Sequence, residues 1–419
     1  MAWLRFKVIV VLWAIAFLVA VIPGVARQSV ESEPAKQTFS SFDSPTGPAG
    51  QRLYDVGGLR FDEAELTSVL ALYETVSART VVRGEGLPKV TFSLHNQTPL
   101  NRVETLQLLD TLLAANGVTM VLNGTTAVKA VPSDNVTGEV PPTINRPADQ
   151  LPDSSSYMTT TVPLENLWLP LDKRTQAQIV QVMWLFSHSL RDSVTVNTNS
   201  HQLVLRDYSA NVRQMLCLLE QFNPASGVVP VVRSTNTNVP KRTFSSFDAP
   251  VGPAGQLQVM GGQRIIEDTE LPKVLEIYQA ISGRTVIRSA RLPQVKMTLR
   301  NQAPLNRVET LQALDNLLAQ NGVSMVLIGD NAVKATDMPN DEVAPIINLP
   351  ADKLPDSSSY MLAFVRPNQA DLGRLVGMMG MKAQQPNGII YAPSAKLLIL
   401  RDYSSSVREM LRILQDAEK

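Results

Sequence analysis

The sequence predicts an α+β protein made of tandem small domains, each with two helices on short mixed sheets, and duplicated along the chain. Strand-like alternation and helix-like apolar stripes follow one another in short stretches, which is typical of small α+β domains. Residues 66–130 and 271–335 align without a gap, and roughly 40 of the 65 positions are identical. Pro-rich segments near 131–153 and 336–356 divide each copy into a first and a second module.

The composition favours binding or scaffolding over enzyme chemistry. The 419 residues include 38 basic and 38 acidic side chains, so the formal net charge is zero, which argues against a nucleic-acid-binding protein. The single Cys excludes an intramolecular disulfide and multi-Cys metal sites. Three His leave little room for a His-rich metal centre.

Residues 1–26 have the pattern of a secretory signal peptide. Arg5 and Lys7 precede the apolar run 8–22, and Pro23 then interrupts any helix. The run is shorter than the roughly 20 residues that span a bilayer. We therefore expect export to the periplasm with no stable membrane span after the signal is removed, and an uncleaved inner-membrane anchor is the alternative.

The repeats and linkers predict the domain boundaries. After the signal come a linker (27–52), first module of copy one (53–132), linker (133–155), second module of copy one (156–222), linker (223–255), first module of copy two (256–336), linker (337–358) and second module of copy two (359–419).

The first module is predicted to alternate strands and helices. Leu66, Val69, Leu70, Tyr73 and Val76 form one apolar helical stripe. Residues 80–82 follow as a short strand, and alternation over 90–94 predicts a half-buried one. We expect Pro99 near the first turn of a second helix. Its buried face comprises Val103, Leu106, Leu109, Leu112 and Leu113.

Two Asn-Gly pairs mark the end of the first module's second helix and the turn that follows. Asn116-Gly117 ends the helix, because both residues tolerate a left-handed cap. Asn123-Gly124 is a hairpin signal between strands 118–122 and 127–130.

The second module is predicted to run strand, helix, strand, strand, helix. In copy two these elements are 360–365, 369–381, 389–392, 397–400 and 404–417. Asp402 or Ser404 is expected to cap the last helix. Copy one has a longer loop around Trp168.

Several segments resemble one known family. In the first module they are 66–73, 90–94 and 103–118, and in the second module they are 202–213, 396–403 and 407–408. The first module resembles the short signalling-type domain, and the second the ring-building, KH-like domain, of secretins. Secretins are the outer-membrane channel subunits of type II secretion and type IV pilus systems. The chain ends at Lys419 without a long carboxy-terminal β-domain, so we do not expect a pore.

The resemblance implies a periplasmic secretin-like scaffold or accessory protein that acts by protein–protein interaction. The implied partners are secretion or pilus envelope proteins, among them a full-length secretin or an inner-membrane platform protein. Self-association is also open, and nucleic acid is not expected. The alternative is a stand-alone periplasmic module that binds peptidoglycan or a signalling peptide. We predict no enzyme, no cofactor, and no catalytic, cofactor-binding or metal-binding residue.

Two sets of residues carry candidate chemistry, and each has a simpler interpretation. His95, His188 and His201 do not recur in copy two, which favours surface or packing roles; we expect His95 at the end of a strand, His188 in a helix and His201 before a strand. Arg206-Asp207 recurs as Arg401-Asp402, and a strand-end Arg followed by a helix-capping Asp is favoured over a ligand site.

The remaining candidates are also interpreted structurally. Gly57-Gly58 and Gly261-Gly262 are predicted to be turn or bulge glycines. Met378-Met379-Gly380-Met381 is predicted to fill a helical core. The segment 153–156 is predicted to be a linker before a strand, and Cys217 a packing residue in a helix over 212–222.

Overall fold

The computed structural model describes most of both copies. The described residues are 52–124, 126–163, 173–188, 193–197, 199–222, 257–259, 264–300, 305–329, 331–337, 339, 344–347, 349–367, 372–393 and 396–417. The signal at 1–26, the linker 223–255, nearly all of the linker 27–52, Gly261-Gly262 and the loop around Trp168 lie outside them.

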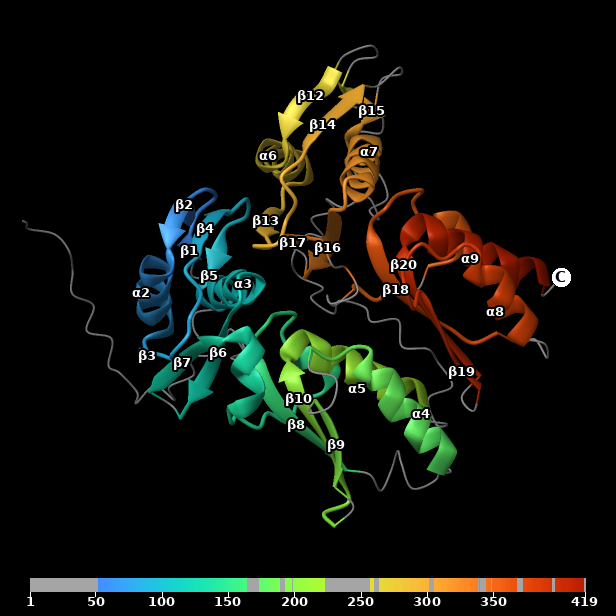
Figure 1. Ribbon diagram of the computed structural model, residues 1–419, viewed down its shortest axis with the longest axis horizontal. Coiled ribbons are helices and arrows are strands. Elements are labelled where there is room, and N and C mark those ends of the chain that lie inside the picture. The colour runs from blue at the N-terminus through green and yellow to red at the C-terminus, as the bar shows by residue number, and fades with distance from the viewer. Residues whose placement is uncertain are drawn as a thin grey trace, which may run out of the picture. The chain divides into compact units, whose positions relative to one another are not determined.

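The first module of each copy contains two helices and three small sheets (Figure 1). In copy one the elements are β1 (Arg52–Tyr54), β2 (Arg60–Glu65), α2 (Leu66–Ser77), β3 (Thr80–Arg83), β4 (Thr91–His95), β5 (Leu100–Asn101), α3 (Arg102–Ala115), β6 (Val118–Asn123) and β7 (Ala127–Pro132). β1 pairs with β5, β2 pairs with β4, and the third sheet has the order β3-β7-β6. In this third sheet β3 and β7 are parallel, and β6 and β7 form the predicted hairpin.

Copy two repeats this first module. Its elements are β11 (Leu257–Val259), β12 (Arg264–Glu270), α6 (Leu271–Ser282), β13 (Thr285–Arg288), β14 (Lys296–Arg300), β15 (Leu305–Asn306), α7 (Arg307–Gln320), β16 (Ser324–Ile328) and β17 (Ala332–Thr336). The pairings β11-β15, β12-β14 and β13-β17-β16 match those of copy one. Strands β1, β2 and β5 were not predicted, and β2 alternates too weakly between buried and exposed positions to give a signal.

Helix α3 begins later than the position of Pro99 suggested. Asn101 is its N-cap and accepts a hydrogen bond from the Glu104 amide at 2.9 Å, while Glu104 accepts one from the Asn101 amide at 2.8 Å. This reciprocal capping box sets the first turn, and Pro99 lies before β5 instead. Asn306 and Glu309 form the same box in α7.

The second module is a three-stranded antiparallel sheet with two helices on one face (Figure 1). In copy one the elements are β8 (Tyr157–Pro163), α4 (Lys173–Trp184), β9 (Val194–Asn197), β10 (Gln202–Tyr208) and α5 (Ser209–Phe222). In copy two they are β18 (Tyr360–Val365), α8 (Leu372–Gly380), β19 (Ile389–Ala392), β20 (Leu397–Tyr403) and α9 (Ser404–Ala417). The sheet orders are β8-β10-β9 and β18-β20-β19, so the predicted order of elements is confirmed.

The helices bury the apolar stripes that the sequence indicated. Val69, Leu70, Tyr73 and Val76 of α2 are buried, as are Val407, Met410, Leu411 and Leu414 of α9. The α+β fold class is therefore confirmed. Among the residues that the structure describes, no helix is long and apolar enough to cross a bilayer.

Candidate protein-interaction site

A buried polar contact joins the first module to the second in each copy. In copy one the Tyr73 hydroxyl of α2 donates to Asp110 Oδ1 of α3 at 2.8 Å, and the Ser156 hydroxyl donates to Asp110 Oδ2. Asp110 is only 3% exposed. Burial, with the Asp110 carboxylate beside it, raises the pKa of Tyr73 well above 10, so the hydroxyl stays a donor at physiological pH.

Copy two repeats this contact. Asp315 accepts a hydrogen bond from the Ser359 hydroxyl and also binds the Tyr278 side chain. Because each carboxylate binds a helix of its own module and a serine at the start of the next module, it couples the two modules. The same residue types in the same places give both copies one architecture.

A serine cluster lies beside this carboxylate, in a segment that was predicted to be a linker. The Ser154 hydroxyl lies 3.0 Å from that of Ser156 and 3.2 Å from that of Ser209 in α5. Ser357, Ser359 and Ser404 form the matching cluster in copy two. Ser154 is 2% exposed, so the simple linker interpretation is incomplete. The repetition of residues 151–157 as 354–360, unchanged within a Pro-rich stretch, was the available signal.

A tyrosine at the end of the central strand makes a second bridge between modules. The Tyr208 hydroxyl lies 2.6 Å from Thr119 Oγ1 in β6, and the Tyr403 hydroxyl lies 2.7 Å from Ser324 Oγ in β16. Tyr208 is 8% exposed. Buried hydrogen bonds of this kind hold two modules in one orientation, because separating them leaves polar groups without partners.

One oxygen of the Asp in each Arg-Asp pair binds a loop, and the other accepts from the amide of the tyrosine just before the helix, at 2.7 Å in both copies. Neither Asp accepts a first-turn backbone amide as the predicted helix cap would. Asp207 accepts hydrogen bonds from the His188 amide and the Ser193 hydroxyl, both at 2.8 Å. Asp402 likewise accepts from the amides of Gln384, at 2.7 Å, and Gln385. Both carboxylates are buried, and burial is the main reason why the pKa of each is raised. They fix the loop that leads from the helix to the next strand.

Ser404, the alternative helix cap, acts as a donor. Its hydroxyl donates to the Ser357 carbonyl at 2.8 Å and to the Pro355 carbonyl at 3.0 Å. It therefore ties α9 to the segment before β18.

The three His lie in separate places. His95 ends β4 and His201 precedes β10, as predicted. His188 follows α4 instead of lying within it, because the helix ends at Trp184. Within the described residues, no group of three or more His, Cys, Asp or Glu is placed to hold a metal ion.

Cys217 packs in α5, as predicted. It is 4% exposed, and burial raises the pKa of its thiol to about 11. The thiol is therefore protonated at neutral pH, which makes it a poor nucleophile.

Gly57 and the methionine run give mixed outcomes. Gly57 has a φ of +73°, which fits the predicted turn. Met379 is buried, but Met378 is 39% exposed and Met381 is 79% exposed. The predicted core role therefore holds for Met379 alone, because α8 ends at Gly380 and only one side of it faces the sheet.

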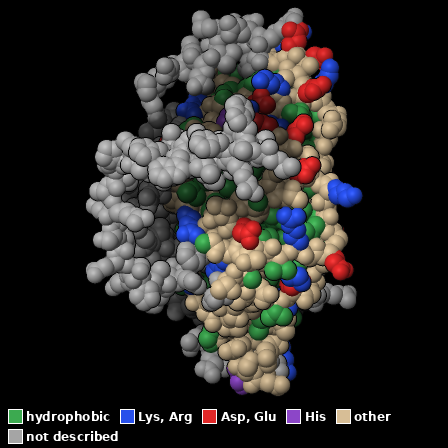
Figure 2. All heavy atoms as spheres, turned by 90° about the vertical axis from the view of Figure 1, so that its left-hand side faces the viewer, with side chains coloured by type: hydrophobic (Ala, Val, Ile, Leu, Met, Phe, Trp, Pro, Cys, Tyr) green, Lys and Arg blue, Asp and Glu red, His purple; other side chains and the backbone are tan. Residues whose placement is uncertain are grey.

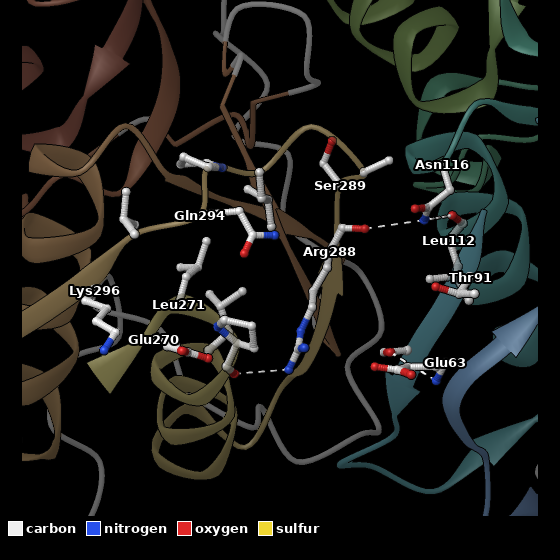
Figure 3. Close-up of a pocket in the computed structure, with 17 residues that line it drawn as sticks. Glu63, Thr91, Leu112, Asn116, Glu270, Leu271, Arg288, Ser289, Gln294 and Lys296 are labelled. Atoms are coloured by element: carbon white, nitrogen blue, oxygen red, sulfur yellow. Dashed lines mark hydrogen bonds between the residues drawn. The ribbon is translucent and has the colours of Figure 1, made fainter. Parts of the chain in front are cut away.

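Figure 3 shows a hollow whose polar side chains mostly serve their own modules. The Arg288 guanidinium donates to the Pro272 carbonyl at 3.1 Å. Asn116 Nδ2 donates to the Leu112 carbonyl at 2.8 Å and to the Arg288 carbonyl at 3.3 Å. These bonds have structural roles, and we assign no ligand site to the hollow.

The edge strand β3 of copy one is accessible. Val82 is 44% exposed, and Thr80 and Arg83 are also exposed. Glu74 Oε1 accepts a hydrogen bond from the outward-facing Val81 amide at 3.3 Å. The matching strand β13 of copy two is buried at Thr285, Val286 and Ile287. Acidic and basic side chains are interspersed over the face drawn in Figure 2.

No family model and no curated protein matches this sequence. Among solved structures, it is similar to the N-terminal domain of the secretin XcpQ from Pseudomonas aeruginosa (8% identity, TM-score 0.19, covering 86% of this chain and 98% of that one). It is also similar to the GspC–GspD complex of the enterotoxigenic Escherichia coli type II secretion system (23% identity, TM-score 0.16, covering 39% and 96%).

A third similar structure is the Klebsiella pneumoniae type II secretion system outer membrane complex of PulD, PulS and the PulC HR domain. Its identity is 13%, its TM-score is 0.31, and the match covers 86% of this chain and 50% of that one. Because all three TM-scores are below 0.5, none of these likenesses supports a functional argument.

Proposed function

We propose that this protein is a periplasmic scaffold or accessory protein of a type II secretion or type IV pilus system and acts by binding other envelope proteins. Three observations support the proposal. Residues 1–26 have the pattern of an export signal. Both module types resemble secretin amino-terminal domains in their sequence segments. Each copy is a pair of modules held together by buried hydrogen bonds, which suits a rigid docking unit.

The exposed edge strand β3 is the observation that carries the proposal. An edge strand can accept a strand from a partner protein, because half of its main-chain groups have no ladder partner. The Thr80 and Gly84 amides donate toward β7, to Thr126 and Ala130, so alternation turns the Val81 and Arg83 amides outward. The Glu74 carboxylate accepts a hydrogen bond from the Val81 amide, and a partner strand would displace this carboxylate.

Site-specific crosslinking in cell envelopes tests this function. A photo-crosslinking residue at Val82 is expected to capture a secretion or pilus envelope protein. Arg83→Pro removes an outward amide and is expected to weaken this capture about tenfold, since a partner's main-chain hydrogen bond is lost. Glu74→Ala is expected to strengthen it.

The matched control is a crosslinker at Val140, which is 83% exposed but lies outside the sheets. It is expected to capture none of the same partner. Val82 adducts that contain no secretion or pilus component would overturn the proposal.

A further inference from the structure

The two second modules share a fold but differ on the outer face of the sheet, which points away from their own helices. The strand registers place Thr161 opposite Val204 in copy one, and Phe364 opposite Ile399 in copy two. Thr161 of copy one is therefore equivalent to Phe364 of copy two. By the same alignment, Thr195 is equivalent to Ile390 and Gln202 to Leu397. Polar positions of copy one are thus apolar in copy two.

Burial follows this difference. In copy two Leu397 and Ile399 are fully buried and Phe364 is 6% exposed. In copy one Thr195 is exposed and Val204 is partly exposed. An apolar sheet face is stable only when another surface covers it, whereas a polar face is stable in water.

Residues of the second module of copy one help to cover copy two's outer sheet face, together with Val326 and Ala344 of copy two itself. Met183 and Phe186 belong to the same buried cluster as Phe364 and Ile399. Arg401 Nη1 donates to the Leu185 carbonyl at 2.9 Å, and its guanidinium carbon lies 5.7 Å from the centre of the Phe186 ring. This is a cation–π distance, and Arg401 is only 6% exposed.

On the helix face of the second module, the aromatic side chains are in copy one and not in copy two. The His188 and Gln384 amides make the same bond to the buried aspartate of their module, which aligns Phe186 with Lys382. Trp184 therefore aligns with Gly380. At these two positions copy one carries aromatic side chains where copy two has a cation and a glycine, whereas Leu185 aligns with Met381.

The last helices, α5 and α9, also differ in charge at aligned positions. Gln214 and Gln221 of α5 are buried and uncharged, and the aligned residues of α9 are Glu409 and Asp416. Glu409 is 41% exposed and pairs with Arg412 at 2.6 Å. The helix face of copy two therefore carries charged side chains, alongside the exposed Met378 and Met381.

We propose that the chain pairs with itself in one direction: the helix face of copy one's second module docks on the outer sheet face of copy two's second module. A contact between unlike faces of similar modules normally propagates into rings or filaments. Here it stops after one step, because the outer sheet face of copy one is largely polar and the helix face of copy two carries charges and lacks the Trp184 and Phe186 side chains of copy one. The pairing is thus a closed contact within one chain, and it does not depend on the secretion role.

Cutting the folded chain tests this pairing. A specific protease site is inserted within residues 223–256, the full chain is purified and cut, and the products are followed by size-exclusion chromatography with light scattering. The two halves are expected to elute together. Phe364→Thr combined with Leu397→Gln places copy-one residues in the copy-two face and is expected to weaken the association at least about tenfold.

The matched control changes the same positions of copy one conservatively, by Thr161→Ser with Gln202→Asn, and is expected to leave the halves together. Phe186→Lys tests the opposite face and is expected to separate them; circular dichroism of each variant verifies folding. Halves of the unmodified chain that separate at micromolar concentration would overturn the proposal. An uncut chain that elutes as a dimer, and becomes a monomer on Phe364→Thr with Leu397→Gln, would also overturn it.

Discussion

The Tyr73 hydroxyl donates a hydrogen bond to the Asp110 carboxylate at 2.8 Å, across the two helices of the first module. The carboxylate also binds Ser156, which lies 46 residues further along the chain at the start of the second module. The buried Asp110 carboxylate therefore links the two helices of the first module to the start of the second module. Tyr278, Asp315 and Ser359 make the same connection in copy two.

Tyr73→Phe is expected to lower the free energy of unfolding by about 1–3 kcal/mol, because a buried carboxylate oxygen loses a donor. Urea unfolding followed by circular dichroism measures the change. The control Tyr54→Phe alters a partly exposed ring and should have a smaller effect. Equal unfolding free energies for Tyr73→Phe and the unmodified protein would show that the bond does not stabilise the fold.

Asp402→Asn is expected to change the pH dependence of stability. Burial raises the pKa of Asp402 above 3.8, so the folded chain binds this proton more tightly than the unfolded chain. As the pH rises from 3.8 through the raised pKa, the folded state therefore loses stability. The unfolding free energy of the unmodified protein minus that of the variant should fall over this range.

Urea unfolding at a series of pH values measures this difference. Asp352→Asn removes an exposed carboxyl group of copy two and serves as the control for the loss of one acidic side chain. A difference for Asp402→Asn that rises with pH would contradict a raised pKa for the Asp402 carboxyl group.

Cys217 is expected to resist alkylation in the native protein. At neutral pH the thiol is both buried and protonated, since its pKa is raised to about 11. Maleimide labelling should be at least roughly 100-fold slower than in the urea-unfolded chain, because it requires local opening. Mass spectrometry of timed samples gives both rates, and comparable rates would mean that α5 is not packed as described.

Asn101→Ala is expected to cost about 1 kcal/mol of stability, because the α3 capping box loses its side-chain acceptor. Asn306→Ala should cost a similar amount in copy two, where the box is the same. Asn101→Asp keeps an acceptor and should stay near the unmodified value. Thermal and urea unfolding provide the comparison; an Ala variant as stable as the Asp variant would exclude the capping contribution.

Much of the fold could be predicted from local pattern. The stripe of α2 and the hairpin at Asn123-Gly124 depend on residues close together in the chain, and both appear as expected. Strands β1 and β2 were missed, because a short strand with few buried residues has little periodicity. The start of α3 differs from the predicted one, because the capping box of Asn101 and Glu104, and not Pro99, sets its first turn.

The roles of the repeated aspartates Asp207 and Asp402 could not be predicted from local sequence pattern. Asp207 and Asp402 stand directly before helices, where a capping role is the usual local interpretation. The structure instead gives one oxygen of each carboxylate partners in a loop 14 to 19 residues earlier. Which donors reach a buried oxygen depends on how the helix, loop and sheet pack together.

The amino-acid sequence by itself determined the duplication, the order of helices and strands and most of the apolar stripes, because these depend on neighbouring residues. The tertiary structure alone decided that the serine segments are buried junctions and that the outer sheet face of copy two is covered while that of copy one is only partly covered. The physical reason is that burial and hydrogen-bond partners are set by groups distant along the chain, which only packing brings together.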